Sequence, residues 1–165
     1  MSGYDVGVER LPLQTLFDLK EPRRALADWC EDLPSFPRLA NTAVSRDGVM
    51  LCWVGPERWL LRAELGRESG LLEALRPEEA PPGISVVCVS DTLAFFRVTG
   101  ADADQVMAIA CPLDLHASVF GADAVSWTEA FGQKALVMRC AGGFDLAVEQ
   151  SFGAMVADYF DRALA

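Results

Sequence analysis

The stretch from 95 to 116 constrains the fold of this chain more than any other. Its first five residues, Phe95 to Thr99, are bulky or β-branched and predict a half-buried strand. Gly100 follows as the expected N-cap of a short helix, because Asp102 and Asp104 place acidic charge in the first turn, where the helix dipole favours it. The stretch therefore predicts a strand, a glycine hinge and a helix.

A proline ends this helix. Pro112 has no N–H and disfavours a helical conformation at Cys111, so the helix is expected to stop near Ala110. The residues around this proline form a motif of six, Cys111-Pro112-Leu113-Asp114-Leu115-His116. A rigid turn that is polar at its tip is expected here, and it is a candidate edge for docking to another protein.

The rest of the pattern predicts an α+β fold made of two small lobes of antiparallel sheet with packed helices. The chain has 165 residues, and we expect a single domain whose lobes cover about 1–76 and 84–165, separated by the proline-rich segment 77–83. Ile84 to Val89 is almost continuously apolar and predicts a strand covered on both faces. Ser151 is expected to cap the last helix, whose apolar stripe consists of Phe152, Met155, Val156, Tyr159, Phe160 and Ala163.

A weak internal repeat runs through both predicted lobes. The order strand, turn, strand, helix occurs around Trp59 and again around Phe144 at a common offset. Either a true duplication or the general similarity of two small α+β lobes explains this echo.

Composition excludes several classes of function. A net charge of −10 disfavours nucleic acid as a partner, and no apolar run reaches the roughly 18 residues that a membrane span needs. The sequence begins without a secretion signal, and its five cysteines are widely spaced, which favours free buried thiols in a reducing cytoplasm. The chain has a single histidine, His116, and its cysteines do not show the spacing of metal ligands. The sequence therefore predicts no metal site.

Catalytic chemistry is also not predicted. Cys111, Asp114 and His116 are the only combination that suggests a nucleophile, but Cys111 follows a helix C-terminus, where the dipole opposes a thiolate. A local hydrogen bond between Asp114 and His116 that ties the turn is the simpler interpretation. No phosphate-binding glycine loop or dinucleotide motif occurs in the chain.

The six-residue motif, followed by Phe120, resembles the gamma subunit family of heterotetrameric sarcosine oxidase. Two further patches are similar to that family in the same order, Pro37 to Asn41 leading into Val49 to Leu61, and Phe144 to Phe152. The resemblance implies a non-catalytic, structural subunit of a cytoplasmic complex that demethylates sarcosine to glycine. It also implies alpha, beta and delta subunits as partners, which would carry FAD, FMN, NAD and tetrahydrofolate.

The segment Arg97 to Ala103 is similar to a strand–glycine–helix unit of the glycine-cleavage T-protein family, whose members bind tetrahydrofolate. That family carries a hairpin with an acidic residue that serves folate chemistry. At the matching place this chain has Phe131-Gly132-Gln133-Lys134-Ala135, without a carboxylate. Two alternative functions remain. The chain is either a stand-alone folate-binding module or the same subunit in a complex that acts on another N-methyl amine.

Overall fold

The computed structural model describes residues 3–31 and 33–165, which form ten strands and four α-helices within these ranges. The chain forms two compact units. The middle unit comprises Leu13–Asp91, and the terminal unit comprises Met1–Pro12 together with Thr92–Ala165. Each unit contains one antiparallel five-stranded sheet, so the predicted α+β class with two antiparallel sheets is confirmed.

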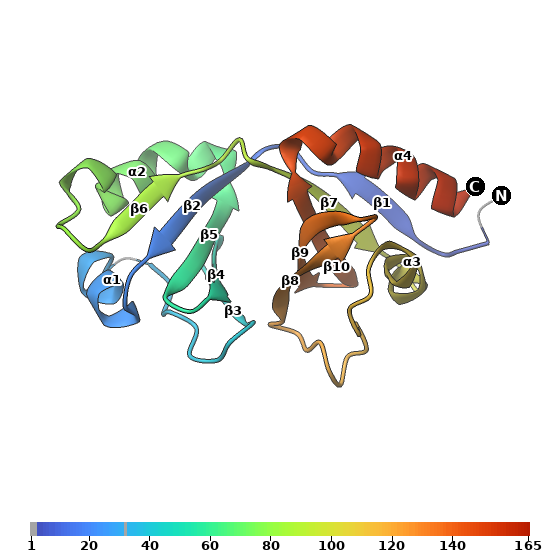
Figure 1. The fold of residues 1–165 in the computed structure, drawn as a ribbon, viewed down its shortest axis with the longest axis horizontal. Helices are drawn as coiled ribbons and strands as arrows, with labels where there is room; N and C mark the ends of the chain where they lie inside the picture. Colours follow the sequence, from blue (N-terminus) through green and yellow to red (C-terminus); the bar gives the residue numbers. More distant parts are fainter. Residues whose placement is uncertain (1–2, 32) are drawn as a thin grey trace. The chain divides into compact units, whose positions relative to one another are not determined.

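The middle unit has the strand order β3-β4-β5-β2-β6 (Figure 1). Apolar residues of both of its helices, including Leu26, Leu71 and Leu75, pack with sheet residues such as Phe17 and Leu61 in one core. The bounds are β2 Gln14–Lys20, α1 Arg23–Trp29, β3 Ala43–Arg46, β4 Val49–Gly55, β5 Arg58–Glu64, α2 Glu68–Leu75 and β6 Ser85–Cys88, with 3₁₀ turns η1 Leu65–Arg67 and η2 Pro77–Glu79.

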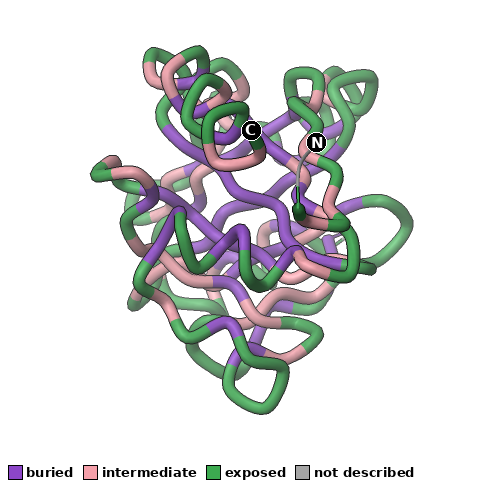
Figure 2. The backbone as a smooth tube through the Cα atoms, turned by 90° about the vertical axis from the view of Figure 1, so that its right-hand side faces the viewer, coloured by how far each residue is buried: buried purple, intermediate pink, exposed green. Residues whose placement is uncertain are grey.

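The terminal unit has the strand order β1-β7-β10-β9-β8. Its core joins Val106 and Met107 of one helix, Val156 and Phe160 of the other, and the sheet residue Phe144 with its neighbours. The bounds are β1 Gly7–Arg10, β7 Leu93–Thr99, α3 Ala103–Ala110, β8 Val125–Ala130, β9 Gln133–Cys140, β10 Gly143–Glu149, η3 Gln150–Phe152 and α4 Gly153–Leu164. Buried residues concentrate in the strands, and exposed ones in the turns and outer helix faces (Figure 2).

The two sheets have the same topology. In both units the strand second from one edge of the sheet, β2 or β7, leads to a helix, three antiparallel strands, a 3₁₀ turn and a second helix. Strands β5 and β10, turns η1 and η3, and helices α2 and α4 begin 85 residues apart, at Arg58 and Gly143, Leu65 and Gln150, and Glu68 and Gly153. The weak sequence echo is therefore a true structural repeat.

The fifth strand of the two sheets comes from different ends of the repeat. In the middle unit β6 follows α2 and pairs with β2, whereas in the terminal unit the N-terminal β1 pairs with β7 in the equivalent position. This pairing changes the expected boundaries. The division lies after Pro12 and after Asp91 rather than at 77–83, because β6 completes the middle sheet and the 77–79 turn lies inside that unit.

Three local predictions are wrong. Ile84 to Val89 is not covered on both faces: β6 is an edge strand, and Val87 is 48% exposed, while the neighbouring β2 has buried residues on both faces. Gly100 is not the N-cap of α3, which is Asp102. Ser151 lies in η3, where its hydroxyl donates to Glu149 Oε1, and Phe152 precedes the first residue of α4.

The predicted stripe on α4 is buried only in part. Val156 and Phe160 are buried, whereas Tyr159 is partly exposed and stacks on Phe131 with 5.1 Å between ring centroids. Within the described residues, no helix is long and apolar enough to cross a membrane.

Candidate functional site

The six-residue motif begins where α3 ends. Helix α3 stops at Ala110, as the proline predicts, and Cys111 is extended with φ −141° and ψ 151° while its N–H donates to the Met107 carbonyl. Cys111 and Leu115 are buried in the core of the terminal unit, while Pro112, Asp114 and His116 are exposed. The motif therefore anchors two apolar side chains and presents a polar surface between them.

Short hydrogen bonds hold the exposed part of the motif. The His116 N–H donates to Asp114 Oδ1 at 3.0 Å, and the His116 ring nitrogen Nδ1 lies 2.7 Å from the Ser118 hydroxyl. The His116 carbonyl accepts the N–H groups of Val119 and Phe120. The predicted link between Asp114 and His116 exists, but it runs through the backbone N–H rather than the imidazole, so the histidine is not paired with a carboxylate as a catalytic base would be.

Arg139, on β9, fixes the loop that follows the motif. One of its guanidinium nitrogens donates to the Leu115 carbonyl at 2.5 Å and to the Phe120 carbonyl at 2.8 Å, and Nε donates to the same Phe120 carbonyl at 3.2 Å. The guanidinium lies 4.2 Å from the centre of the Phe144 ring and 3.7 Å from a carboxylate oxygen of Asp104 on α3. This one side chain connects β9, β10, α3 and the loop.

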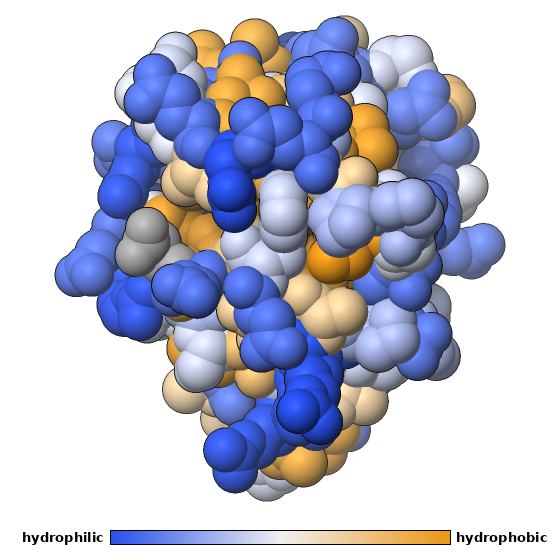
Figure 3. Space-filling view, turned by 90° about the vertical axis from the view of Figure 1, so that its left-hand side faces the viewer, coloured by the Kyte–Doolittle hydropathy of each residue, from blue (hydrophilic) through white to orange (hydrophobic). Residues whose placement is uncertain are grey.

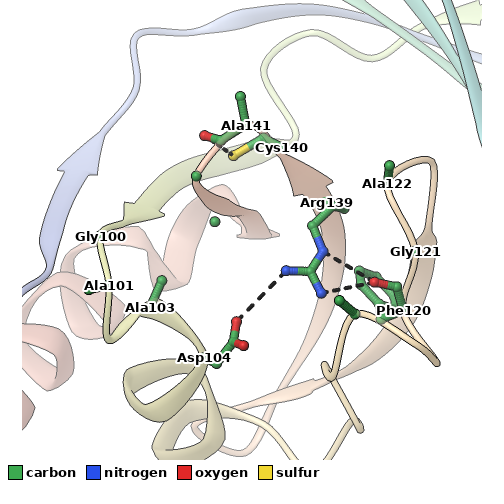
Figure 4. Close-up of a pocket in the computed structure, with 13 residues that line it drawn as sticks. Gly100, Ala101, Ala103, Asp104, Phe120, Gly121, Ala122, Arg139, Cys140 and Ala141 are labelled. Carbon is green, nitrogen blue, oxygen red and sulfur yellow. Dashed lines mark hydrogen bonds and ion pairs between the residues drawn. The ribbon is translucent and has the colours of Figure 1, made fainter.

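A hollow of about 550 Å³ opens beside Arg139 (Figure 4). Most of its lining residues are glycine or alanine, and Asp104 and Arg139 provide its charged groups. Because these two side chains already pair with each other, the hollow presents no free charge from them. Its surface suits packing against another protein segment better than acid–base chemistry.

Two glycines on this hollow have no room for a side chain. Gly100 has φ +135°, and a Cβ there would collide with the Asp5 backbone, which is held by a hydrogen bond from the Asp102 N–H to the Asp5 carbonyl. A Cβ on Gly143 would collide with the Val98 carbonyl of β7. Both glycines therefore permit close backbone packing at the rim, and this is the structural role of the Gly100 hinge.

Cys111 is poorly suited to nucleophilic catalysis. Burial raises the pKa of the Cys111 thiol above its ordinary value, and the hydrogen bond from the Leu113 backbone offsets this only in part. A protonated thiol is a weak nucleophile. The structure thus brings the six motif residues into one turn without forming a catalytic triad from them.

Sequence reasoning missed Arg139. The arginine follows four buried residues of β9, Ala135 to Met138, and its contacts reach residues 19 to 35 positions away in sequence. The available signal is a basic residue directly after an apolar run, here Ala135 to Met138. Arg97 is another arginine in a strand of this sheet. It donates two hydrogen bonds, of 2.8 and 2.9 Å, to the carboxylate of the buried Asp145.

The described residues can be compared with what a metal ion or folate would need. No group of three or more His, Cys, Asp or Glu side chains in these ranges could hold a metal ion. The hairpin compared with the T-protein family is a tight turn at Phe131-Gly132, and β8 and β9 pair up to its last residues, Ala130 and Gln133. The nearest carboxylate in sequence, Glu129, lies in β8 opposite Lys134, so the turn itself carries no acidic side chain.

Comparison with known families identifies the chain. Residues 31–165, which include the whole motif and Arg139, match the model of the sarcosine oxidase gamma subunit family. The chain belongs to this family. The match includes both sequence patches noted above as well as the motif, and it begins after the first helix of this gamma-family chain.

Solved structures share the fold of this gamma-family chain. A chain of the heterotetrameric sarcosine oxidase from Corynebacterium sp. U-96 superposes with a TM-score of 0.81 at 23% identity, over 96% of this chain and 83% of that one. The glycine cleavage system aminomethyltransferase T from Bartonella henselae gives a TM-score of 0.70 at 15% identity. That match covers 98% of this chain but 47% of the aminomethyltransferase, so this chain spans about half its length. No curated protein gives a significant match.

Proposed function

We propose that this chain is the structural gamma subunit of a heterotetrameric sarcosine oxidase. The family match over residues 31–165 carries the proposal, because it includes the six-residue motif and the arginine that holds its loop. The fold shared with a chain of the Corynebacterium oxidase supports it. The complex would demethylate sarcosine oxidatively to glycine.

The proposal assigns no chemical step to this chain. Its motif cysteine is a buried thiol with a raised pKa. The imidazole ring of its histidine bonds to a serine, and the Asp114 carboxylate bonds to the backbone N–H of that histidine instead. Alpha, beta and delta subunits would carry the catalytic groups, namely FAD, FMN, NAD and tetrahydrofolate. The gamma chain would contribute a rigid surface to the assembly, centred on the motif turn and the neighbouring hollow.

A cytoplasmic location forms part of the proposal. All five cysteines are free thiols, and Cys30, Cys52 and Cys111 are buried. Such cysteines are typical of proteins that fold in a reducing compartment.

Co-expression of this chain with the alpha, beta and delta subunits of the oxidase tests the proposal. We expect a stoichiometric complex with sarcosine-dependent oxygen consumption, held by an interface above roughly 2,000 Å², as is typical of permanent complexes. The isolated chain should show no amine oxidation. Normal assembly and turnover of the other subunits without this chain would contradict the structural role.

Two further measurements separate the alternative functions. Activity of the complex with another N-methyl amine, but not with sarcosine, would identify the sister complex. Calorimetric titration of the isolated chain with tetrahydrofolate should give no tight binding. A dissociation constant in the low micromolar range, about −8 kcal/mol, would instead favour a stand-alone folate module.

A further inference from the structure

The middle unit contains a strongly basic hollow of about 550 Å³. It lies between α1, the connector that follows it and the end of β3. Four of the chain's 14 basic residues line it, Arg23, Arg24, Arg38 and Arg46. Among the described residues that line it, one carries a carboxylate, Glu31. Such a concentration of arginines is unexpected in a chain with a net charge of −10.

The apolar residues of this hollow are held rigidly. Leu33, Pro34 and Phe36 line it and are buried, and the Phe36 ring packs edge-on against Trp59 with 5.2 Å between centroids. Proline fixes the backbone of this connector. The side of the molecule drawn in Figure 3 shows strongly hydrophilic residues around small apolar patches. The hollow is therefore preformed, with an apolar base and a charged rim.

The four arginines differ in their partners. Arg46 donates to the Leu33 carbonyl at 2.7 Å and lies 3.9 Å from an Asp47 carboxylate oxygen, so it helps to hold the connector. Arg23, Arg24 and Arg38 are exposed and make no hydrogen bond or ion pair with any residue that the structure describes. No ion pair with a described residue therefore neutralises these three guanidinium groups.

We propose that this hollow docks an acidic segment of another subunit, with an apolar side chain of that segment on the Leu33–Phe36 base. Guanidinium groups bind carboxylates through two parallel hydrogen bonds, which makes arginine the preferred residue for such contacts. Like charges without partners only repel each other in the isolated chain, whereas complementary charge in a complex steers association and fixes its register. The inference rests on the proposed subunit function.

Two of these arginines lie outside the region that matches the family. Arg23 and Arg24 precede residue 31, while Arg38 and Arg46 lie within the match. The docking contact therefore combines a helix that precedes the matched region with a connector inside it. This contact is separate from the motif turn, which belongs to the terminal unit.

A competition experiment tests the proposal. The variant Arg23→Gln/Arg24→Gln/Arg38→Gln competes with the wild-type chain during co-expression with the oxidase subunits, and mass spectrometry gives their ratio in the purified complex. The variant Lys20→Gln/Lys134→Gln/Arg162→Gln removes the same charge from exposed positions outside the hollow. We expect the arginine variant to be under-represented by about tenfold or more at low salt and the control to compete nearly equally.

Each other outcome has a defined meaning. Equal incorporation of the arginine variant, with the melting temperature of the wild type, overturns this inference and leaves the subunit function intact. Failure of the wild-type chain itself to enter the complex overturns the subunit function and this inference with it. A third outcome would reassign the hollow to a small anion. In that case the isolated wild-type chain binds pyrophosphate saturably, the arginine variant does not bind it, and the variant still enters the complex as well as the wild type.

Discussion

At the scale of single residues, the site depends on Arg139 more than on the motif's own polar groups. Its three hydrogen bonds reach two carbonyls of the loop, and its side chain is only 15% exposed. Asp114 is exposed and accepts one backbone N–H. Removal of the Asp114 carboxylate should therefore cost less stability than removal of a buried hydrogen-bond partner would.

Arg139→Lys should lower the free energy of unfolding by roughly 1.5–3 kcal/mol, because lysine keeps the charge but loses the planar fork that reaches both carbonyls. Urea unfolding followed by circular dichroism measures the change. Arg162→Lys is the matched control, since Arg162 is exposed on α4 and pairs with the exposed Asp158, and it should stay within about 0.5 kcal/mol of the wild type. Equal stability of the two variants would show that Arg139 does not fix the loop.

At the scale of elements, close backbone contact between strands decides where glycine is required. Gly143 begins β10 opposite Thr99 at the end of β7, and the Val98 carbonyl occupies the space of its missing Cβ. Gly70, by contrast, lies inside α2 with nothing within 4 Å of the position of a Cβ. The two glycines therefore respond to the same substitution in opposite directions.

Gly143→Ala should destabilise the protein by about 2 kcal/mol or more, because β10 has to move away from β7. Gly70→Ala should stabilise it by roughly 0.5–1 kcal/mol, since alanine restricts the unfolded chain and favours helix. Thermal unfolding of both variants beside the wild type is the measurement. A Gly143→Ala protein that melts at the wild-type temperature would refute the close contact between the strands.

At the scale of the whole molecule, buried thiols couple global stability to alkaline pH. Burial raises the pKa of the Cys52 thiol from 9.0 to about 12, and nearby Arg62 offsets this only in part. In the unfolded chain the thiol ionises above about pH 9, while the folded protein keeps it protonated. Unfolding then releases a proton, so the stability from this group is complete below pH 9 and declines as the pH rises toward 12.

Between about pH 9 and 10.5, Cys52 should account for a stability loss of roughly 2 kcal/mol. Cys52→Ala should therefore show a shallower decline of unfolding free energy than the wild type over this range, although its stability at neutral pH is lower. Cys88→Ala is the control, because Cys88 is exposed. Urea unfolding at a series of pH values gives the slopes, and identical slopes for the Cys52 variant and the wild type would exclude the coupling.

Local sequence patterns predicted much of the fold for physical reasons that act over a few residues. Pro112 ends α3 at Ala110. Asp47-Gly48, with φ values of 51° and 76°, forms the turn between β3 and β4, as an Asp-Gly pair between two strands typically does. Hydrophobic alternation and turn residues likewise led to the α+β class. The family resemblance depended on one compact motif, which the family match contains.

Tertiary structure alone decided what depends on distant pairing. The continuous apolar run at Ile84–Val89 looks the same in sequence whether its strand lies at the edge or inside a sheet, and only the pairing of β6 with β2 places it at the edge. In the terminal sheet, β1 takes the place that β6 has in the middle sheet. No local signal in the sequence predicts this pairing, because β1 and β7 lie about 90 positions apart. Arg139 gains its role in the same way: each partner carbonyl lies in a loop that folding brings to β9, and no pattern of neighbouring residues encodes that contact.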